Sequence, residues 1–489
     1  MNAKEFLNNV SKEIKYKPAN KYISDELESH IEELKNDNLC KGLSEEQAEE
    51  TAVEQMGDAK KIGKRLNRIH RPKLDWITLI FSLAFIYFGG QFWSLFHLES
   101  YWNNGEHFAS WYRYYRWVCI ELIIGVLFSI FLLFYDYRKI CKHSKLLFII
   151  ATALNMIAYF KGLKANGNIV HAFWPFTSTS PAVFTVPLYI IAFAGFLKDI
   201  NKESKINITI SNGNKINYNF IKIIMLSCIA VISSLMINFV SGFLVAIVYL
   251  IMSVRELLKR KQIKKIIKLI GASIIGFTIL SMIFCIIPIR QTHIWDEFTS
   301  AFWFGIDTVG ERRIDFIRGE VYKAAKVFGK ADLQGISLKD DHGYRASIEN
   351  SFGTRDIFAF LGILEEYGWV ASIGFIVILL AFDIKLVMSA RKIKDPYGKL
   401  IVIGITSLFI VQTICNLGMN VGIIEVTEFE LPLISGGKSN FIANILCMSL
   451  FLSVYRRKDI NFEEPKKSKL VAKIEDFFFE EVEENKETL

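Results

Sequence analysis

The sequence has little charge for its length and no paired cysteines. Asp, Glu, Lys and Arg make up 22% of the 489 residues, against 52% hydrophobic residues, and the mean hydropathy is +0.28. These values average two unlike parts, a charged segment at 1–73 and a remainder threaded with long apolar runs, and the runs exclude a wholly soluble enzyme. The seven cysteines are scattered without a CxxC pair, and most lie in apolar runs, which excludes a disulfide framework.

The positive net charge does not indicate a nucleic-acid partner. The 58 Lys and Arg residues outnumber the 50 Asp and Glu residues, which gives a formal charge of +8. Basic residues of a membrane protein gather at its cytoplasmic surface, and here they stand in short clusters between apolar runs. We therefore expect no nucleic acid to bind.

Residues 1–73 lack the apolar stretch of a cleavable signal peptide, because they carry 14 basic and 14 acidic side chains.

Ile23, Leu27 and Ile31 recur with helical spacing, and Ser44-Glu45-Glu46-Gln47 has the pattern of a capping box. The pattern predicts a small cytosolic bundle of three or four helices. The segment resembles the helical prefix domain of some bacterial permeases and regulatory membrane proteins, through motifs such as Gly42–Ala48 and Met56–Ala59. This resemblance implies an interaction module with a cytosolic partner, and no enzyme.

Long apolar runs fill residues 74–458, and a membrane-spanning helix needs about 20 mainly apolar residues. The fold class predicted is therefore an all-α polytopic membrane protein with about ten transmembrane helices, preceded by the cytosolic bundle and followed by a charged cytosolic tail at 459–489. The predicted spans are 76–96, 117–135, 145–160, 182–198, 220–236, 239–254, 267–288, 369–388, 400–423 and 439–455.

Basic clusters occupy every second loop between these spans. Examples are Arg138–Lys145, Arg255–Lys268 and Arg391–Lys399. Positive charge marks the cytoplasmic side, so both termini are expected in the cytoplasm of a bacterial cell. The long segment 288–356 then lies outside the membrane. A loop of this length is usually functional, and it carries charges of both signs.

The segment behind this loop is apolar but too short to span a membrane. Ile357–Leu364 is followed by Glu365 and Glu366 before the next span. Lipid does not solvate two carboxylates, which favours a re-entrant segment or one buried against other helices. The alternative places both glutamates at the outer membrane interface.

From Arg355 to Arg457 the sequence resembles the SEDS family, the FtsW, RodA and SpoVE proteins of cell division, elongation and sporulation. The family's landmarks appear in order: Asp356, the Glu365-Glu366-Tyr367-Gly368 run, Lys394–Leu400, Asn416-Leu417-Gly418, and Leu431–Asn440 with its Gly-Gly pair. Ten spans with the large outer loop between the seventh and eighth also match the family pattern.

The resemblance implies polymerisation of lipid II, an undecaprenyl-diphosphate-linked disaccharide, usually with a class B penicillin-binding protein as partner. Such inverting glycosyl transfer needs a carboxylate to accept the proton of the attacking hydroxyl, and Asp356 corresponds to the family's essential Asp. Donors must stabilise the departing diphosphate. No cofactor motif is found, and a divalent-cation requirement stays open. The candidate substrate-binding residues are Arg355, Glu365, Glu366, Pro432, Ser435, Gly437, Lys438 and Ser439.

Some family motifs are changed in this chain. The family's His-Thr-Asp is Thr354-Arg355-Asp356, and its motif before the fourth span is Ser180–Val186 without the two charged residues. Two functions therefore remain open. One is a divergent glycan polymerase, and the other is a non-catalytic SEDS-like scaffold or signalling protein that acts through its prefix domain. A permease is less favoured, because charges at span centres are scarce.

Overall fold

The computed structural model describes residues 1–103, 123, 125–161, 163–165, 168–173, 176–179, 181–199, 207–209, 215–259, 359–421, 429–434 and 438–459. The chain divides into two compact units. The first, the head unit, contains Met1–Leu74 and the chain from Arg456 onward, and the second, the membrane unit, contains Asp75–Tyr455.

Four helices form the head unit: α1 (Ala3–Glu13), α2 (Lys17–Cys40), α3 (Glu45–Met56) and α4 (Ala59–His70). Ser44 and Gln47 cap α3 reciprocally, which confirms the predicted capping box. The predicted stripe is also confirmed, because Ile23 and Ile31 are buried and Leu27 packs against the same core. Helix α1 completes this core with Phe6.

The head unit also holds the residues that end the last long helix. The backbone N–H of Lys73 donates to the carbonyl of Arg456 over 2.9 Å. The ammonium group of Lys73 lies 3.2 Å from the carboxylate of Asp459, and the guanidinium of Arg457 donates to the Tyr16 hydroxyl over 3.4 Å. The beginning of the predicted tail is thus part of this unit's packing.

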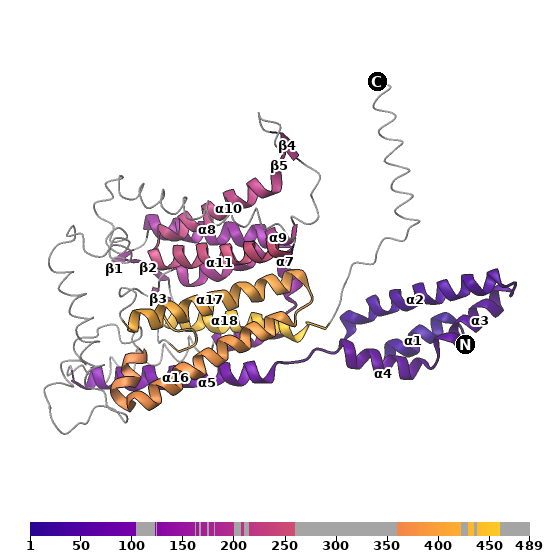
Figure 1. Ribbon diagram of the computed structural model, residues 1–489, viewed down its shortest axis with the longest axis horizontal. Coiled ribbons are helices and arrows are strands. Elements are labelled where there is room, and N and C mark those ends of the chain that lie inside the picture. The colour runs from indigo at the N-terminus through magenta and orange to yellow at the C-terminus, as the bar shows by residue number, and fades with distance from the viewer. Residues whose placement is uncertain are drawn as a thin grey trace. The chain divides into compact units, whose positions relative to one another are not determined.

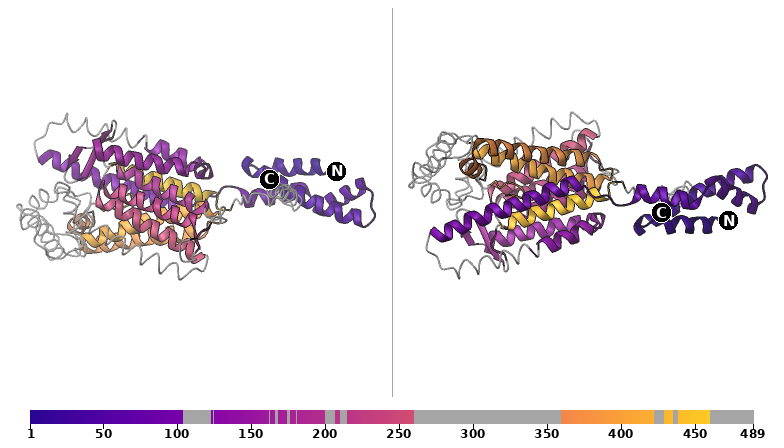
Figure 2. Two further views of the ribbon diagram at one scale, coloured as in Figure 1. Left: turned by 90° about the horizontal axis from the view of Figure 1, so that it is seen from above. Right: turned by 90° about the horizontal axis from the view of Figure 1, so that it is seen from below.

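The membrane unit consists mainly of long apolar helices, which lie side by side in Figures 1 and 2. Nine of them coincide with nine of the ten predicted spans, and the tenth, 267–288, lies outside the described residues. Four are long and apolar enough to cross a membrane by length and composition, and five are shorter apolar helices. The helices are α5 (Trp76–Asn103), Gly125–Phe134, α8 (Ser144–Lys161), α9 (Ala182–Asp199), α10 (Tyr218–Leu235), α11 (Phe239–Lys259), α16 (Ala359–Arg391), α17 (Pro396–Asn420) and α18 (Lys438–Arg456), with the short α7 (Tyr137–Cys141) between spans.

Two small antiparallel sheets in the connections were not predicted. Strands β1 (Leu163–Ala165), β2 (Asn168–Phe173) and β3 (Phe176–Thr179) pair in that order between α8 and α9. Strands β4 (Asn207–Thr209) and β5 (Lys215–Asn217) pair between α9 and α10. The prediction of an all-helical bundle is confirmed for the spans themselves.

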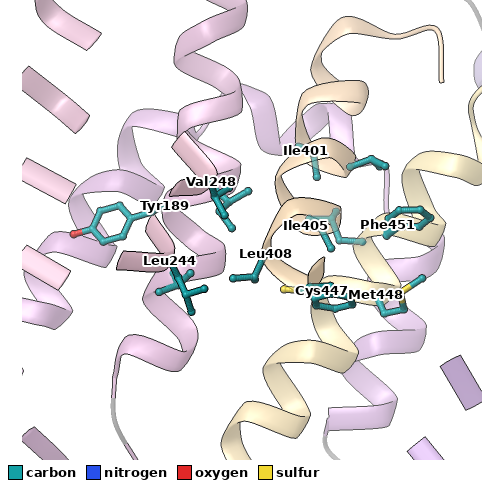
Figure 3. Packing of buried hydrophobic residues seen from close by; sticks show 14 of the residues in the cluster. Tyr189, Leu244, Val248, Ile401, Ile405, Leu408, Cys447, Met448 and Phe451 are labelled. Carbon is teal, nitrogen blue, oxygen red and sulfur yellow. The ribbon is translucent and has the colours of Figure 1, made fainter. Parts of the chain in front are cut away.

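Helix α17 lies in the middle of the membrane unit and contacts α9, α11 and α16. Figure 3 shows Leu244 and Val248 of α11 facing Leu408 of α17, while Phe451 of α18 lies on the other side of α17. A helix that is apolar on all sides is expected where other helices surround it. Helix α17 therefore forms the core against which the spans pack.

An ion pair joins the start of α5 to α16. The ammonium group of Lys385 lies 2.9 Å from the carboxylate of Asp75, and the Ser389 hydroxyl donates to the same carboxylate over 2.7 Å. Burial alone raises the pKa of Asp75, but these hydrogen bonds, together with those from Thr78, outweigh it and hold the pKa below its ordinary value. The buried charges are thus paired, as a low-dielectric setting requires.

Candidate functional site

The described members of the predicted site belong to two helices, α16 and α18, and to the turn before α18. Asp356, Arg355, Ser435 and Gly437 lie outside the described residues. Glu365 and Glu366 belong to α16, and Lys438 and Ser439 begin α18. Pro432 is described fully: it lies in a turn before α18 and is buried.

The first part of α16 is a short buried segment with its own direction. Ala359, Phe360, Leu361 and Leu364 are each at most 2% exposed. The helical backbone is then interrupted at Gly368, where φ is 77° and ψ is −172°. This left-handed conformation favours glycine, because a side chain there would clash with the backbone. The prediction of a buried segment is confirmed for 359–364, whereas the side chains of Glu365 and Glu366, on which the alternative depends, lie outside the described part of the chain.

Two asparagines at the end of α17 connect this segment to the turn before α18. The side-chain oxygen of Asn420 accepts a hydrogen bond from the backbone N–H of Leu361 over 3.3 Å. The Asn420 amide donates to the side-chain oxygen of Asn416 over 3.1 Å and to its carbonyl over 2.8 Å. The Asn416 amide in turn donates to the carbonyl of Phe429 over 2.6 Å. Both asparagines are fully buried.

We call this chain of hydrogen bonds, from Leu361 through Asn420 and Asn416 to Phe429, the asparagine bridge. The first N–H groups of a helix have no partner within the helix, and Asn420 supplies one for Leu361. Asn416 and Asn420 are four residues apart, so they share one face of α17. The bridge therefore fixes two segments, 359–364 and 429–434, to the same end of α17.

The turn itself is held from a second side by α5. A Cβ atom at Gly89 would lie 2.7 Å from the carbonyl oxygen of Ile434 and 2.9 Å from that of Leu433, so only glycine permits this approach. Leu433 is buried and has a φ of 63°, which is unfavourable for a residue with a side chain. Such strained backbone persists only where the surrounding structure determines it, and it is often found at functional sites.

Sequence reasoning identified Asn416 as part of a motif but missed Asn420 and Gly89. The spacing of four residues between the asparagines was the available signal for Asn420, since a second polar residue on one face of an apolar helix requires a buried partner. No sequence pattern marks Gly89, because its role depends on a turn more than 300 residues away.

The fold and this arrangement define a multi-pass helical membrane protein whose polar groups converge at the end of one central helix. The family model for the cell cycle proteins FtsW, RodA and SpoVE matches residues 75–460. The chain belongs to this family, and it is a multi-pass bacterial membrane protein.

Relatives and solved structures agree with this assignment. The chain is 36% identical over 108 residues to a probable peptidoglycan glycosyltransferase FtsW of Bacillus subtilis (strain 168), which is 22% of this chain and 26% of the relative. It is 30% identical over 101 residues to the peptidoglycan glycosyltransferase RodA of Treponema pallidum (strain Nichols), which is 21% of this chain and 23% of the relative. The chain thus matches about a quarter of the length of these relatives. A chain in a solved peptidoglycan synthase complex superposes with a TM-score of 0.54 at 16% identity, covering 79% of this chain and 99% of that one, which supports the fold.

Proposed function

We propose that this protein polymerises lipid II into glycan strands of peptidoglycan, with Asp356 as the general base. The observation that carries the proposal is the asparagine bridge, because it joins the segment after Asp356 to the turn before Ser435–Ser439. Asp356 precedes α16 by three residues, and three residues reach at most about 11 Å. Ser435 directly follows the buried Ile434. The two candidate segments would therefore meet at one site.

The proposed glycosyl transfer requires one carboxylate as general base and several cationic or hydrogen-bond donor groups for the departing diphosphate. The hydroxyl of one sugar attacks the anomeric carbon of another, its proton passes to the Asp356 carboxylate, and the lipid diphosphate departs with the electron pair of the broken bond. Arg355 and Lys438 supply positive charge for the diphosphate, and the backbone N–H groups near Ser435 and Gly437 supply neutral donors. Glu365, Glu366, Pro432 and Ser439 line the remainder of the proposed substrate site.

The orientation in the membrane follows from the charge pattern. With both termini in the cytoplasm, the segment 288–356 faces the outside, where glycan strands are built. A class B penicillin-binding protein is the proposed partner, and residues 1–73 are the proposed interaction module for a cytosolic partner. The relatives named peptidoglycan glycosyltransferase support the activity.

Polymerisation of lipid II by the purified full chain tests the proposal. The protein is placed in lipid nanodiscs with and without a class B penicillin-binding protein from the same bacterium, and glycan products are separated by gel electrophoresis. Strands in either condition support the polymerase. If neither condition gives strands while the protein is folded, the departures from the family motifs, at Thr354–Asp356 and Ser180–Val186, are decisive and the scaffold function replaces the enzyme.

A further inference from the structure

The outer face of α4 carries a dense row of basic side chains. Between Ala59 and Leu74 the sequence has no acidic residue. Among the described residues, only Lys73 of this row forms an ion pair, with Asp459. All members of the row are exposed; Lys60, Lys61, Lys64, Arg65 and Arg68 belong to α4, and Arg71 and Lys73 follow its end.

The opposite face of α4 is already occupied. Ile62 and Leu66 pack against the core of the head unit. At Gly63 a Cβ would lie 2.9 Å from the backbone oxygen of Val10, so α1 approaches α4 closely on this side. The basic row therefore points away from the head unit's core, and Ile69 is exposed among it at 46%.

The chain enters the membrane directly after this row. Four residues, 71–74, separate the end of α4 from Asp75, and α5 begins at Trp76 with exposed apolar side chains at Trp76, Ile77 and Ile80. Five residues reach at most about 18 Å. The covalent connection thus keeps the basic row near the lipid headgroups that surround the start of α5.

We propose that the outer face of α4 binds the headgroups of anionic phospholipids in the leaflet where α5 begins. Basic residues next to a membrane span attract anionic lipids with about 1 kcal/mol each near the surface, or about fivefold per residue. The exposed Ile69 adds an apolar contact of the kind found in helices that lie at a membrane interface. Anionic lipid would thereby hold the head unit at the membrane surface.

The chain's own acidic end is the competing occupant. Residues 475–489 contain seven acidic side chains and one lysine, and they follow the contact between Lys73 and Asp459. The lipid is favoured because α4 is tethered beside it by only a few residues, whereas the acidic segment begins 16 residues after Asp459.

Hydrogen–deuterium exchange of the full chain in nanodiscs tests the proposal. Nanodiscs of phosphatidylcholine alone are compared with nanodiscs containing about one third phosphatidylglycerol. We expect slower exchange of the α4 amides in the anionic nanodiscs, reversed by high salt, while α2 and α3 exchange equally in both. Equal exchange of α4 in the two lipids would overturn the proposal.

Two matched variants and a truncation sharpen the test. Lys60→Gln with Lys64→Gln removes two charges from one side of α4, and should weaken the lipid-dependent protection by up to about 25-fold. Lys4→Gln with Lys41→Gln removes two exposed charges elsewhere in the head unit and should leave it unchanged. Equal effects of the two pairs would contradict a specific α4 surface. The truncated chain ends at Asp459. If this truncation abolishes the protection of the α4 amides in both kinds of nanodisc, the acidic tail occupies the outer face of α4 and the lipid proposal fails.

Discussion

Replacing Asn420 by leucine breaks the asparagine bridge while keeping a similar side-chain volume. The Leu361 N–H and the side-chain oxygen of Asn416 each lose a buried partner. An unsatisfied buried polar group costs about 1–3 kcal/mol, so the loss of the partner of the Leu361 N–H should by itself cost the variant about that much stability. Because the loss is local to the start of α16, the segment that follows Asp356 should also become less ordered.

Asn155→Leu is the matched control. Asn155 of α8 is likewise fully buried, and its side-chain oxygen accepts from the Thr185 hydroxyl over 2.9 Å. This variant also removes a buried amide from the bundle, but Thr185 retains the Ala182 carbonyl as an acceptor. We expect a smaller loss of stability and no change at the start of α16.

Thermal unfolding in nanodiscs measures the stability of both variants, and hydrogen exchange measures the amides of residues 359–364. In Asn420→Leu the unfolding temperature should fall and these amides should exchange faster than in Asn155→Leu. Lipid II polymerisation should fall only in Asn420→Leu. If the amides of residues 359–364 exchange at the same rate in Asn420→Leu as in the wild type, the role given to the bridge is refuted, whatever happens to polymerisation.

Three further predictions concern other contacts. Gly89→Ala should lower the free energy of unfolding by about 1–3 kcal/mol, because its Cβ would overlap the backbone at Ile434. In the control, Gly374→Ala in α16, the added Cβ meets no atom within 4 Å, so this variant should be neutral or slightly stabilising. Thermal unfolding distinguishes the two variants. The pKa of Asp75 is lowered from 3.8, so its ionised form stabilises the fold above that pH and the contribution is lost as the pH falls through the lower folded-state pKa. Asp75→Asn should therefore lower the unfolding temperature at pH 7, and the difference from wild type should shrink in acid; a constant difference would contradict the pairing. Cysteines introduced in 288–356 should react with an impermeant reagent in intact cells, and labelling only after permeabilisation would reverse the topology.

The spans were predictable because a membrane requires long apolar helices with internally paired backbones. The head was predictable from the stripe at Ile23 and Ile31 and from the capping box at Ser44. Strands of three to six residues, such as β1, carry too little periodicity to be recognised in a sequence.

The site was only partly predictable from the sequence. Family resemblance marked Asp356, Asn416 and the turn at Pro432, but the contacts that join these segments are tertiary. Gly89 and Leu433 meet across the fold, and the ion pair between Asp75 and Lys385 connects residues 310 positions apart. Such contacts follow from the packing of helices against one another, which the local pattern of the sequence does not predict.

The initial rate of lipid II polymerisation by Asp356→Asn, relative to wild type in the same nanodiscs, tests the central claim most directly. Asparagine keeps the shape of the side chain but removes the basic oxygen. We expect the rate to fall by about 10²–10⁴-fold with unchanged folding, because a positioned general base contributes that much. Asp341→Asn, in the same segment 288–356, should keep the wild-type rate. Equal rates for wild type and Asp356→Asn would contradict the assignment of the general base.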